Sequence, residues 1–273
     1  MKKAFVIVAL AGLGASAQAG LVTTRIEANP AGARSADNTL SANEYGAGNS
    51  QSYAGNAASG FGGTVGNGTV YMGASNTNWQ VGWQPGGNVN DLFVIYFNVD
   101  SGGTITSQNG SDTSDGGRRA STLPASGSGA SVNYPITVSH TLVFGNFGAV
   151  LFSLAQQPGG FPGQITFLQF TGSASNGAAG NSGFREVSIP YATIGGVMGS
   201  TINWFGLYTS EGGYLSNESI PGTNAWTGNL DGGTNPGLNA GTLTIANYNR
   251  FIPTPGAMAL LGLGGLVAGR RRR

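Results

Sequence analysis

Few residues of this chain are suited to acid–base, nucleophilic or metal chemistry. The 273 residues include a single histidine, His140, no cysteine and eleven acidic residues. The lack of cysteine excludes disulfides, thiolate metal sites and cysteine nucleophiles. His140 begins an apolar run typical of a strand, which favours a strand-edge residue over a catalytic base. Haem ligation would require a second ligand such as Met72 or Met198, and no other feature of the sequence indicates one.

The carboxylates are the other candidates for catalysis. A glycosidase needs two carboxyl groups about 5–9 Å apart across the scissile bond. Glu186 alternates with Val187 and Ile189, a pattern compatible with a buried and hydrogen-bonded carboxylate. The sequence alone does not show which of the five candidate acids lie close together in space. These acids are Glu44, Asp91, Glu186, Glu211 and Glu218. We therefore expect a non-catalytic protein without a cofactor, and a polysaccharide-acting hydrolase or lyase is the alternative.

Calcium is a secondary alternative to the expectation of no cofactor. Aspartates in the turns of exported β proteins can bind Ca²⁺ through their oxygen atoms. The candidate ligands are Asp100, Asp112, Asp115 and Asp231. Their spacing does not match an ordered ligand loop such as an EF-hand, so the sequence defines no metal site.

Aromatic rings supply the candidate binding groups. A pyranose stacks its C–H faces on flat rings, while polar side chains bind its hydroxyls. Trp226 stands among Asn, Thr and Gly residues of a predicted loop, and Tyr214 follows Gly213 in the same stretch. For the strand tryptophans, a role in the core is the favoured interpretation. The predicted ligand-binding residues are Trp83, Tyr208, Tyr214 and Trp226. Arg118 and Arg119 could pair with an acidic polymer, but a solvated loop is the favoured interpretation.

Short apolar or alternating runs separated by Gly, Asn and Ser clusters predict the elements that must position these residues. The uninterrupted run Leu92–Val99 predicts a strand buried on both faces. Further strands are predicted at Thr69–Ala74 and Asn78–Gln84 and at residues 140–144, 149–154, 164–170, 184–189, 202–208 and 241–246. One helical turn is predicted after Pro190, and loops are predicted at residues 101–129 and 209–239.

About ten strands without a composition break or a fixed repeat predict one all-β domain over residues 20–252, an antiparallel, jelly-roll-like β-sandwich. This body has six arginines, no lysine and eleven acids, a net charge of −5. Nucleic-acid binding needs a basic patch that neutralises phosphates. The charge distribution therefore excludes a nucleic-acid partner.

The N-terminus has the layout of a cleaved signal peptide at residues 1–19. Lys2 and Lys3 precede an apolar run at residues 4–13, and Ala17-Gln18-Ala19 forms an Ala-x-Ala cleavage site. The run is shorter than the ~20 residues that a membrane span needs. We expect signal peptidase to cut after Ala19.

Residues 253–273 predict a temporary membrane anchor. Pro253-Thr254-Pro255-Gly256 leads into an apolar stretch that ends at Gly269, and four arginines, Arg270, Arg271, Arg272 and Arg273, follow it. As a helix this stretch would cover about 21 Å, less than the ~30 Å hydrocarbon core. The arginines would stay cytoplasmic by the positive-inside rule. A short, glycine-containing transmembrane helix of this kind suits transient anchoring in the inner membrane.

This C-terminal layout resembles the bacterial PEP-CTERM sorting signal, in which a Pro-rich tripeptide, a short apolar helix and an Arg-rich end follow one another. The glutamate of the namesake Pro-Glu-Pro motif is absent here. The resemblance implies processing by an exosortase-type transpeptidase and delivery to the cell surface or the extracellular polymer.

The order of four segments in the body resembles DOMON-like domains and family 9 carbohydrate-binding modules. Residues 37–45 resemble their opening DGxxxxxEY segment, with Asn38 in place of the glycine. Residues 91–97, 140–144 and 185–195 resemble their central, edge and late strands. The resemblance implies a sugar- or cofactor-binding β-sandwich.

Together these features predict an exported surface or extracellular-matrix protein that binds carbohydrate, with extracellular polysaccharide as its partner. A polysaccharide-acting enzyme and a matrix protein without a specific ligand are the alternatives. A sugar binder predicts exposed aromatic rings. An enzyme predicts a cleft with paired carboxylates and a raised pKa on one of them, and a matrix protein predicts neither.

Overall fold

Fifteen strands, one α-helix and three short 3₁₀ turns form the described part of the chain. The computed structural model describes residues 20–27, 36–42, 44–46, 48–52, 68–87, 91–108, 112–158, 164–173, 183–224 and 242–253. The strands belong to three sheets. The predicted all-β class is therefore confirmed.

The largest sheet, here called the central sheet, has eight strands. Seven of them follow one another in the order β1-β15-β12-β5-β8-β9-β10, and β13 pairs with β12. Their bounds are β1 Leu21–Glu27, β5 Leu92–Val99, β8 His140–Gly145, β9 Gly148–Gln156, β10 Ile165–Ser173, β12 Ile202–Thr209, β13 Leu215–Ile220 and β15 Tyr248–Pro253. Every residue of β5 is buried, as its uninterrupted apolar sequence predicts.

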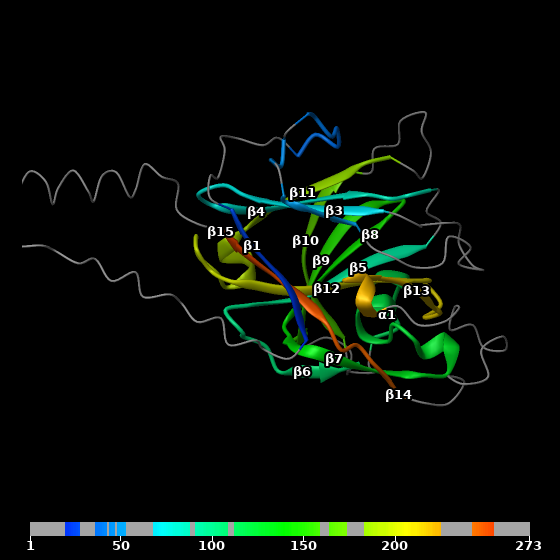
Figure 1. Ribbon diagram of the computed structural model, residues 1–273. Coiled ribbons are helices and arrows are strands. Elements are labelled where there is room, and N and C mark those ends of the chain that lie inside the picture. The colour runs from blue at the N-terminus through cyan, green and yellow to red at the C-terminus, as the bar shows by residue number, and fades with distance from the viewer. Residues whose placement is uncertain are drawn as a thin grey trace, which may run out of the picture.

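Two smaller sheets lie on opposite sides of β5 and β12 (Figure 1). The four-stranded sheet has the order β11-β4-β3-β2, and the three-stranded sheet has the order β14-β7-β6. Their bounds are β2 Ser50–Ser52, β3 Thr69–Ala74, β4 Asn78–Gln84, β6 Ile105–Ser107, β7 Ser131–Val138, β11 Arg185–Pro190 and β14 Thr242–Thr244. The helix α1, Gly116–Thr122, contacts β5, β8 and β9.

The side chains of the central sheet alternate between two hydrophobic cores because successive strand residues point to opposite faces. On β5, Phe93, Ile95 and Phe97 pack toward the four-stranded sheet. Val94 and Tyr96 pack toward α1 and the three-stranded sheet. The core between the central sheet and the four-stranded sheet, here called the first core, contains two buried indoles. Trp83 stacks on Phe93 at 5.1 Å between ring centroids, and Trp79 lies edge-on to Phe97 at 5.0 Å.

The structure corrects several details of the predicted fold. Two pairings, β1 with β15 and β14 with β7, are parallel, so the arrangement is not wholly antiparallel. Six strands lack a strong apolar run in the sequence and were not predicted, namely β1, β2, β6, β7, β13 and β15.

The predicted loops at residues 101–129 and 209–239 contain α1 and β13. The helix is hidden in the sequence because it begins with two glycines, which have low helix propensity. It is instead capped by Asp115, whose carboxylate accepts a hydrogen bond from the Arg118 backbone N–H.

The predicted helical turn is present as the 3₁₀ turn η3, Tyr191–Ile194, which ends at Gly195 with φ of 72°. Pro253, assigned from sequence to the sorting segment, is the buried last residue of β15 and pairs with Glu27. Residues 1–19 and 254–273 lie outside the described residues. Within the described part of the chain, no helix has the length and apolarity needed to cross a membrane.

Candidate functional site

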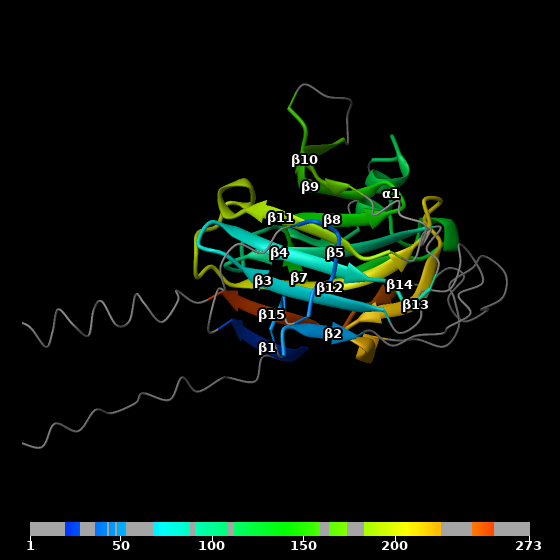
Figure 2. The same cartoon turned by 90° about the horizontal axis from the view of Figure 1, so that it is seen from above.

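A cavity of about 490 Å³ lies where α1 meets the edge of the central sheet. We call it the aromatic cavity. Figure 2 shows α1 beside β9, which pairs with the edge strand β10. Four parts of the chain line it: the start of α1, the β8–β9 turn with β9, the edge strand β10, and the turn after β12. Its residues are Asp115, Gly116, Gly117, Arg118, Phe147, Val150, Phe152, Phe167 and Glu211. The volume falls within the range of about 300–1,000 Å³ typical of small-ligand pockets.

Phenylalanine rings form the apolar part of this cavity. Phe152 on β9 pairs with Phe167 on β10, so both side chains point to the same face, and their rings meet edge to face at 6.2 Å. Phe167 is 40% exposed, and Phe147, in the turn between β8 and β9, is 39% exposed. β10 is the last strand of the central sheet, so nothing in the sheet covers Phe167 from the outer side. The cavity therefore offers aromatic surface to solvent.

Arg118 is held against this aromatic surface by two carboxylates. Its guanidinium lies over the Phe152 ring at 5.2 Å from the centroid. Its Nη1 pairs with Asp115, and its Nε lies 3.4 Å from Asp112 Oδ2. Asp112 in turn accepts a hydrogen bond from the Ile165 backbone N–H at 2.8 Å. These contacts fix the guanidinium in place and balance its charge.

Glu211 lines the cavity next to the start of α1. It belongs to the turn after β12 and packs against Gly116, where an added Cβ would lie 2.7 Å from the Glu211 Cγ. Only glycine at position 116 therefore allows this approach. Burial raises the pKa of the nearby Asp91, the charge of Glu211 raises it further, and a hydrogen bond from the Glu211 backbone N–H partly opposes both effects.

A second cavity, of about 440 Å³, lies beside residues 40–46 and Tyr71. We call it the Tyr45 cavity. Tyr45 is buried and donates a hydrogen bond of 2.5 Å to the carboxylate of Glu186, itself 2% exposed. Burial raises the pKa of Glu186, the Tyr45 hydrogen bond opposes this, and the charges of Glu44 and Asp37 add to it. Asn38 accepts from the Glu186 backbone N–H, so this contact ties the 37–45 segment to β11.

Two of the four aromatic residues predicted to bind a ligand are misplaced for that role. Trp83 and Tyr208 are fully buried in the first core, so the prediction that they contact a ligand is wrong. Each points to the inner face of its strand, and Trp83 is enclosed by Phe93 and by the Arg185 guanidinium. Tyr214 is 39% exposed but does not line the aromatic cavity. Trp226 lies outside the described residues.

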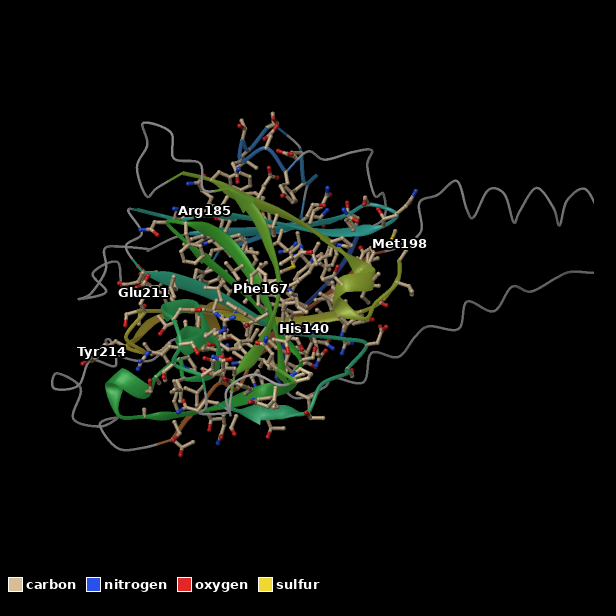
Figure 3. All side chains as sticks on the ribbon, turned by 180° about the vertical axis from the view of Figure 1, so that it is seen from behind. His140, Phe167, Arg185, Met198, Glu211 and Tyr214 are labelled. Atoms are coloured by element: carbon tan, nitrogen blue, oxygen red, sulfur yellow. The ribbon has the colours of Figure 1, made fainter. Side chains whose placement is uncertain are left out.

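The rings that do line the cavity were missed by sequence reasoning, which weighed only tryptophan and tyrosine. The exposure of Phe147 could have been predicted, because it stands between Asn146 and Gly148 in a short turn where a core side chain is unexpected. The exposure of Phe167 could not have been predicted, because it depends on β10 being an edge strand. Figure 3 labels Phe167 near the middle of the view, and Glu211 and Tyr214 at its left.

The three described aspartates among the calcium candidates make contacts within the scaffold. Asp100 accepts from Ser200 Oγ and the Thr201 backbone N–H, both at 2.7 Å. Asp112 and Asp115 hold α1 and Arg118, as described above. Among the described residues, no three His, Asp or Glu side chains are grouped so as to bind a metal ion. Asp231 lies outside the described residues.

Of the remaining titratable candidates, His140 is half-buried and Glu218 is buried. His140 stacks on Phe97 at 5.3 Å between ring centroids, and its Nδ1 lies 2.7 Å from Ser139 Oγ. Burial lowers the pKa of His140 to about 4. Glu218 is buried and accepts a hydrogen bond from Ser216 Oγ. These environments explain both residues as parts of the scaffold.

Comparison of the chain with protein-family models, curated proteins and solved structures finds no match. The likeness to the PEP-CTERM signal and to DOMON-like modules therefore depends on the sequence motifs alone.

Proposed function

We propose that this protein is an exported surface or matrix protein that binds carbohydrate in the aromatic cavity without catalysis. The observation that carries the proposal is the pair of exposed rings, Phe147 and Phe167, beside the charged rim residues Arg118 and Glu211. Aromatic rings stack on the C–H faces of a sugar, and charged side chains bind its hydroxyl groups. The aromatic cavity brings both kinds of contact to one place.

The scaffold in this proposal is a β-sandwich made by the central sheet and the four-stranded sheet. Their shared core supports it, since strands β3, β4 and β11 pack against β5, β8 and β12. The site then lies on the other face of the central sheet, next to α1. A rigid pair of packed sheets would hold Phe147 and Phe167 in place without a ligand.

Export and surface retention in this proposal depend on the two ends of the chain. The start of β1 at Leu21 is compatible with cleavage after Ala19, because such a cut would leave the strand whole. Gly20 itself accepts a hydrogen bond from the Tyr248 backbone N–H at 2.8 Å. Deletion of residues 256–273 should release the protein into the medium, and continued accumulation on the cell surface would contradict the sorting role.

Binding is tested by screening the purified full-length chain against a panel of soluble polysaccharides. Phe167→Ala should weaken binding by about tenfold or more, because it removes the exposed stacking surface. Tyr214→Ala is the matched control, since Tyr214 is equally exposed and lies outside the cavity lining. Circular dichroism would verify that both variants are folded. Loss of binding in Tyr214→Ala but not in Phe167→Ala would contradict this location, and no binding by the parent chain would contradict the function.

A polysaccharide-acting enzyme is the second candidate, and one observation favours it. Asp91 and Glu211 form a pair of neighbouring carboxyl groups, and burial raises the pKa of Asp91. Glu211 lines the aromatic cavity. Release of reducing sugar from a bound polysaccharide would support this candidate, and retention of the polymer intact on long incubation would leave the binding function alone.

A further inference from the structure

Acidic side chains outnumber basic ones around the aromatic cavity. The cavity lining contains two carboxylates, Asp115 and Glu211, and one cation, Arg118. Arg118 already contacts both Asp115 and the buried Asp112. A ligand carboxylate would therefore have to compete with two protein carboxylates for the same guanidinium.

The other elements at the cavity add no positive charge. The described residues of β9, β10 and the β8–β9 turn contain no charged side chain. Asp91, next to Glu211, is a further carboxyl group. Arg119 follows Arg118 on α1 but does not line the cavity. The surroundings are thus acidic and would repel a uronic acid.

Glu211 is the carboxylate best placed to meet a ligand. It is exposed at the rim, and within the described part of the chain no cationic side chain is paired with it. Its backbone is fixed by the hydrogen bond to Asp91, and its side chain lies against Gly116. An ammonium group between this carboxylate and the faces of neighbouring phenylalanine rings would gain both a charge-assisted hydrogen bond and cation–π attraction.

We infer that the aromatic cavity selects a sugar unit with a free amino group, as in a deacetylated amino-sugar polymer, over its N-acetylated form and over uronic acids. This inference depends on the proposed carbohydrate-binding function and names the class of sugar bound at the same site. The rings contact any pyranose, whereas Glu211 distinguishes a sugar with a free amino group from N-acetylated sugars and uronic acids.

The test uses titration calorimetry of the full-length chain with three probes: glucosamine oligomers, the same oligomers N-acetylated, and oligogalacturonate. The pH is kept below the pKa of the sugar amine, at low salt. We expect the glucosamine oligomers to bind at least about tenfold more tightly than the acetylated ones, because the charged hydrogen bond is present only with the amine. Added salt should reduce this preference.

Glu211→Gln should abolish the preference, because it weakens binding of the glucosamine oligomers to the level of the acetylated ones. Glu44→Gln is the matched control, since Glu44 lines the Tyr45 cavity, and it should keep the preference. Equal affinity for amino and acetylated oligomers in the parent chain, or tighter binding of oligogalacturonate, would overturn the inference. If either outcome occurs but Phe167→Ala still abolishes sugar binding, the inference about amino sugars is wrong and the proposed carbohydrate-binding function is still supported. Failure of all three probes and of the wider polysaccharide panel would overturn both.

Discussion

The two faces of the central sheet are covered differently. On one face the four-stranded sheet seals the core, and the Trp79 and Trp83 side chains are fully buried. On the other face α1 and the three-stranded sheet cover β5 and β12, but a cavity stays open over β9 and β10, where Phe167 is exposed. The sealed face uses its aromatic rings for stability, and the open face leaves them available to a ligand.

The same contrast separates the two cavities. At the Tyr45 cavity the Tyr45 hydroxyl donates a hydrogen bond to Glu186, a buried carboxylate that does not line the cavity. In the aromatic cavity Glu211 lies at an exposed rim beside exposed rings. Residue type alone therefore does not identify a binding site here. Whether a ring is buried, and whether a carboxylate is bonded within the protein, decides whether that side chain is available to a ligand.

The largest expected effect is on the sealed face. Trp83→Ala should lower the free energy of unfolding by about 3–5 kcal/mol, because it removes a fully buried indole stacked on Phe93 and leaves a cavity. Phe167→Ala should lower it by less than about 1 kcal/mol, because that ring is already partly in water. Urea denaturation of both variants measures the difference. Equal losses would show that the two faces are not distinct.

The next effect concerns the half-buried His140. The pKa of His140 is lowered to about 4 in the folded state, so the unfolded chain takes up its proton first as the pH falls. This histidine therefore costs stability between about pH 6.5 and pH 4, by at most about 3 kcal/mol. His140→Gln should remove that part of the pH dependence. Thermal unfolding across this range tests it, and parallel pH curves for the two proteins would contradict the assignment.

The smallest effect concerns the position of Glu211. Gly116→Ala should displace the Glu211 side chain, because the new Cβ would lie 2.7 Å from its Cγ. We expect a few-fold weaker binding of amino sugars, less than about 1 kcal/mol, with little change in the unfolding midpoint. Gly212→Ala is the matched control, since Gly212 does not line the cavity and its Cβ would meet its neighbours at 3.6 Å or more. An unchanged affinity in Gly116→Ala would show that Glu211 does not need this position.

The sequence predicts the strongly apolar strands well and the remaining elements poorly. The bounds of β3, β4 and β5 agree with the prediction because their side chains are buried along nearly the whole strand. β7 contains Pro135 and polar residues, and β1 alternates weakly, so neither stands out from its surroundings. The parallel pairing of β1 with β15 joins opposite ends of the described chain, which no local pattern can indicate.

The site was predictable only in parts. Glu211, Arg118 and Asp115 were singled out for separate reasons, as a catalytic candidate, a loop charge and a calcium ligand. Phe147 and Phe167 were not considered. These residues lie far apart in the sequence and meet only because β9, β10, α1 and the turn after β12 converge at one edge of the central sheet. That convergence is a property of the topology.

The most direct test of the central claim is a crystal structure of the full-length chain soaked with the tightest-binding oligosaccharide from the panel. We predict a pyranose ring against Phe147 and Phe167, with a polar group of the sugar within hydrogen-bond distance of Glu211. A sugar bound in the Tyr45 cavity or against Tyr214, with the aromatic cavity empty, would contradict the account.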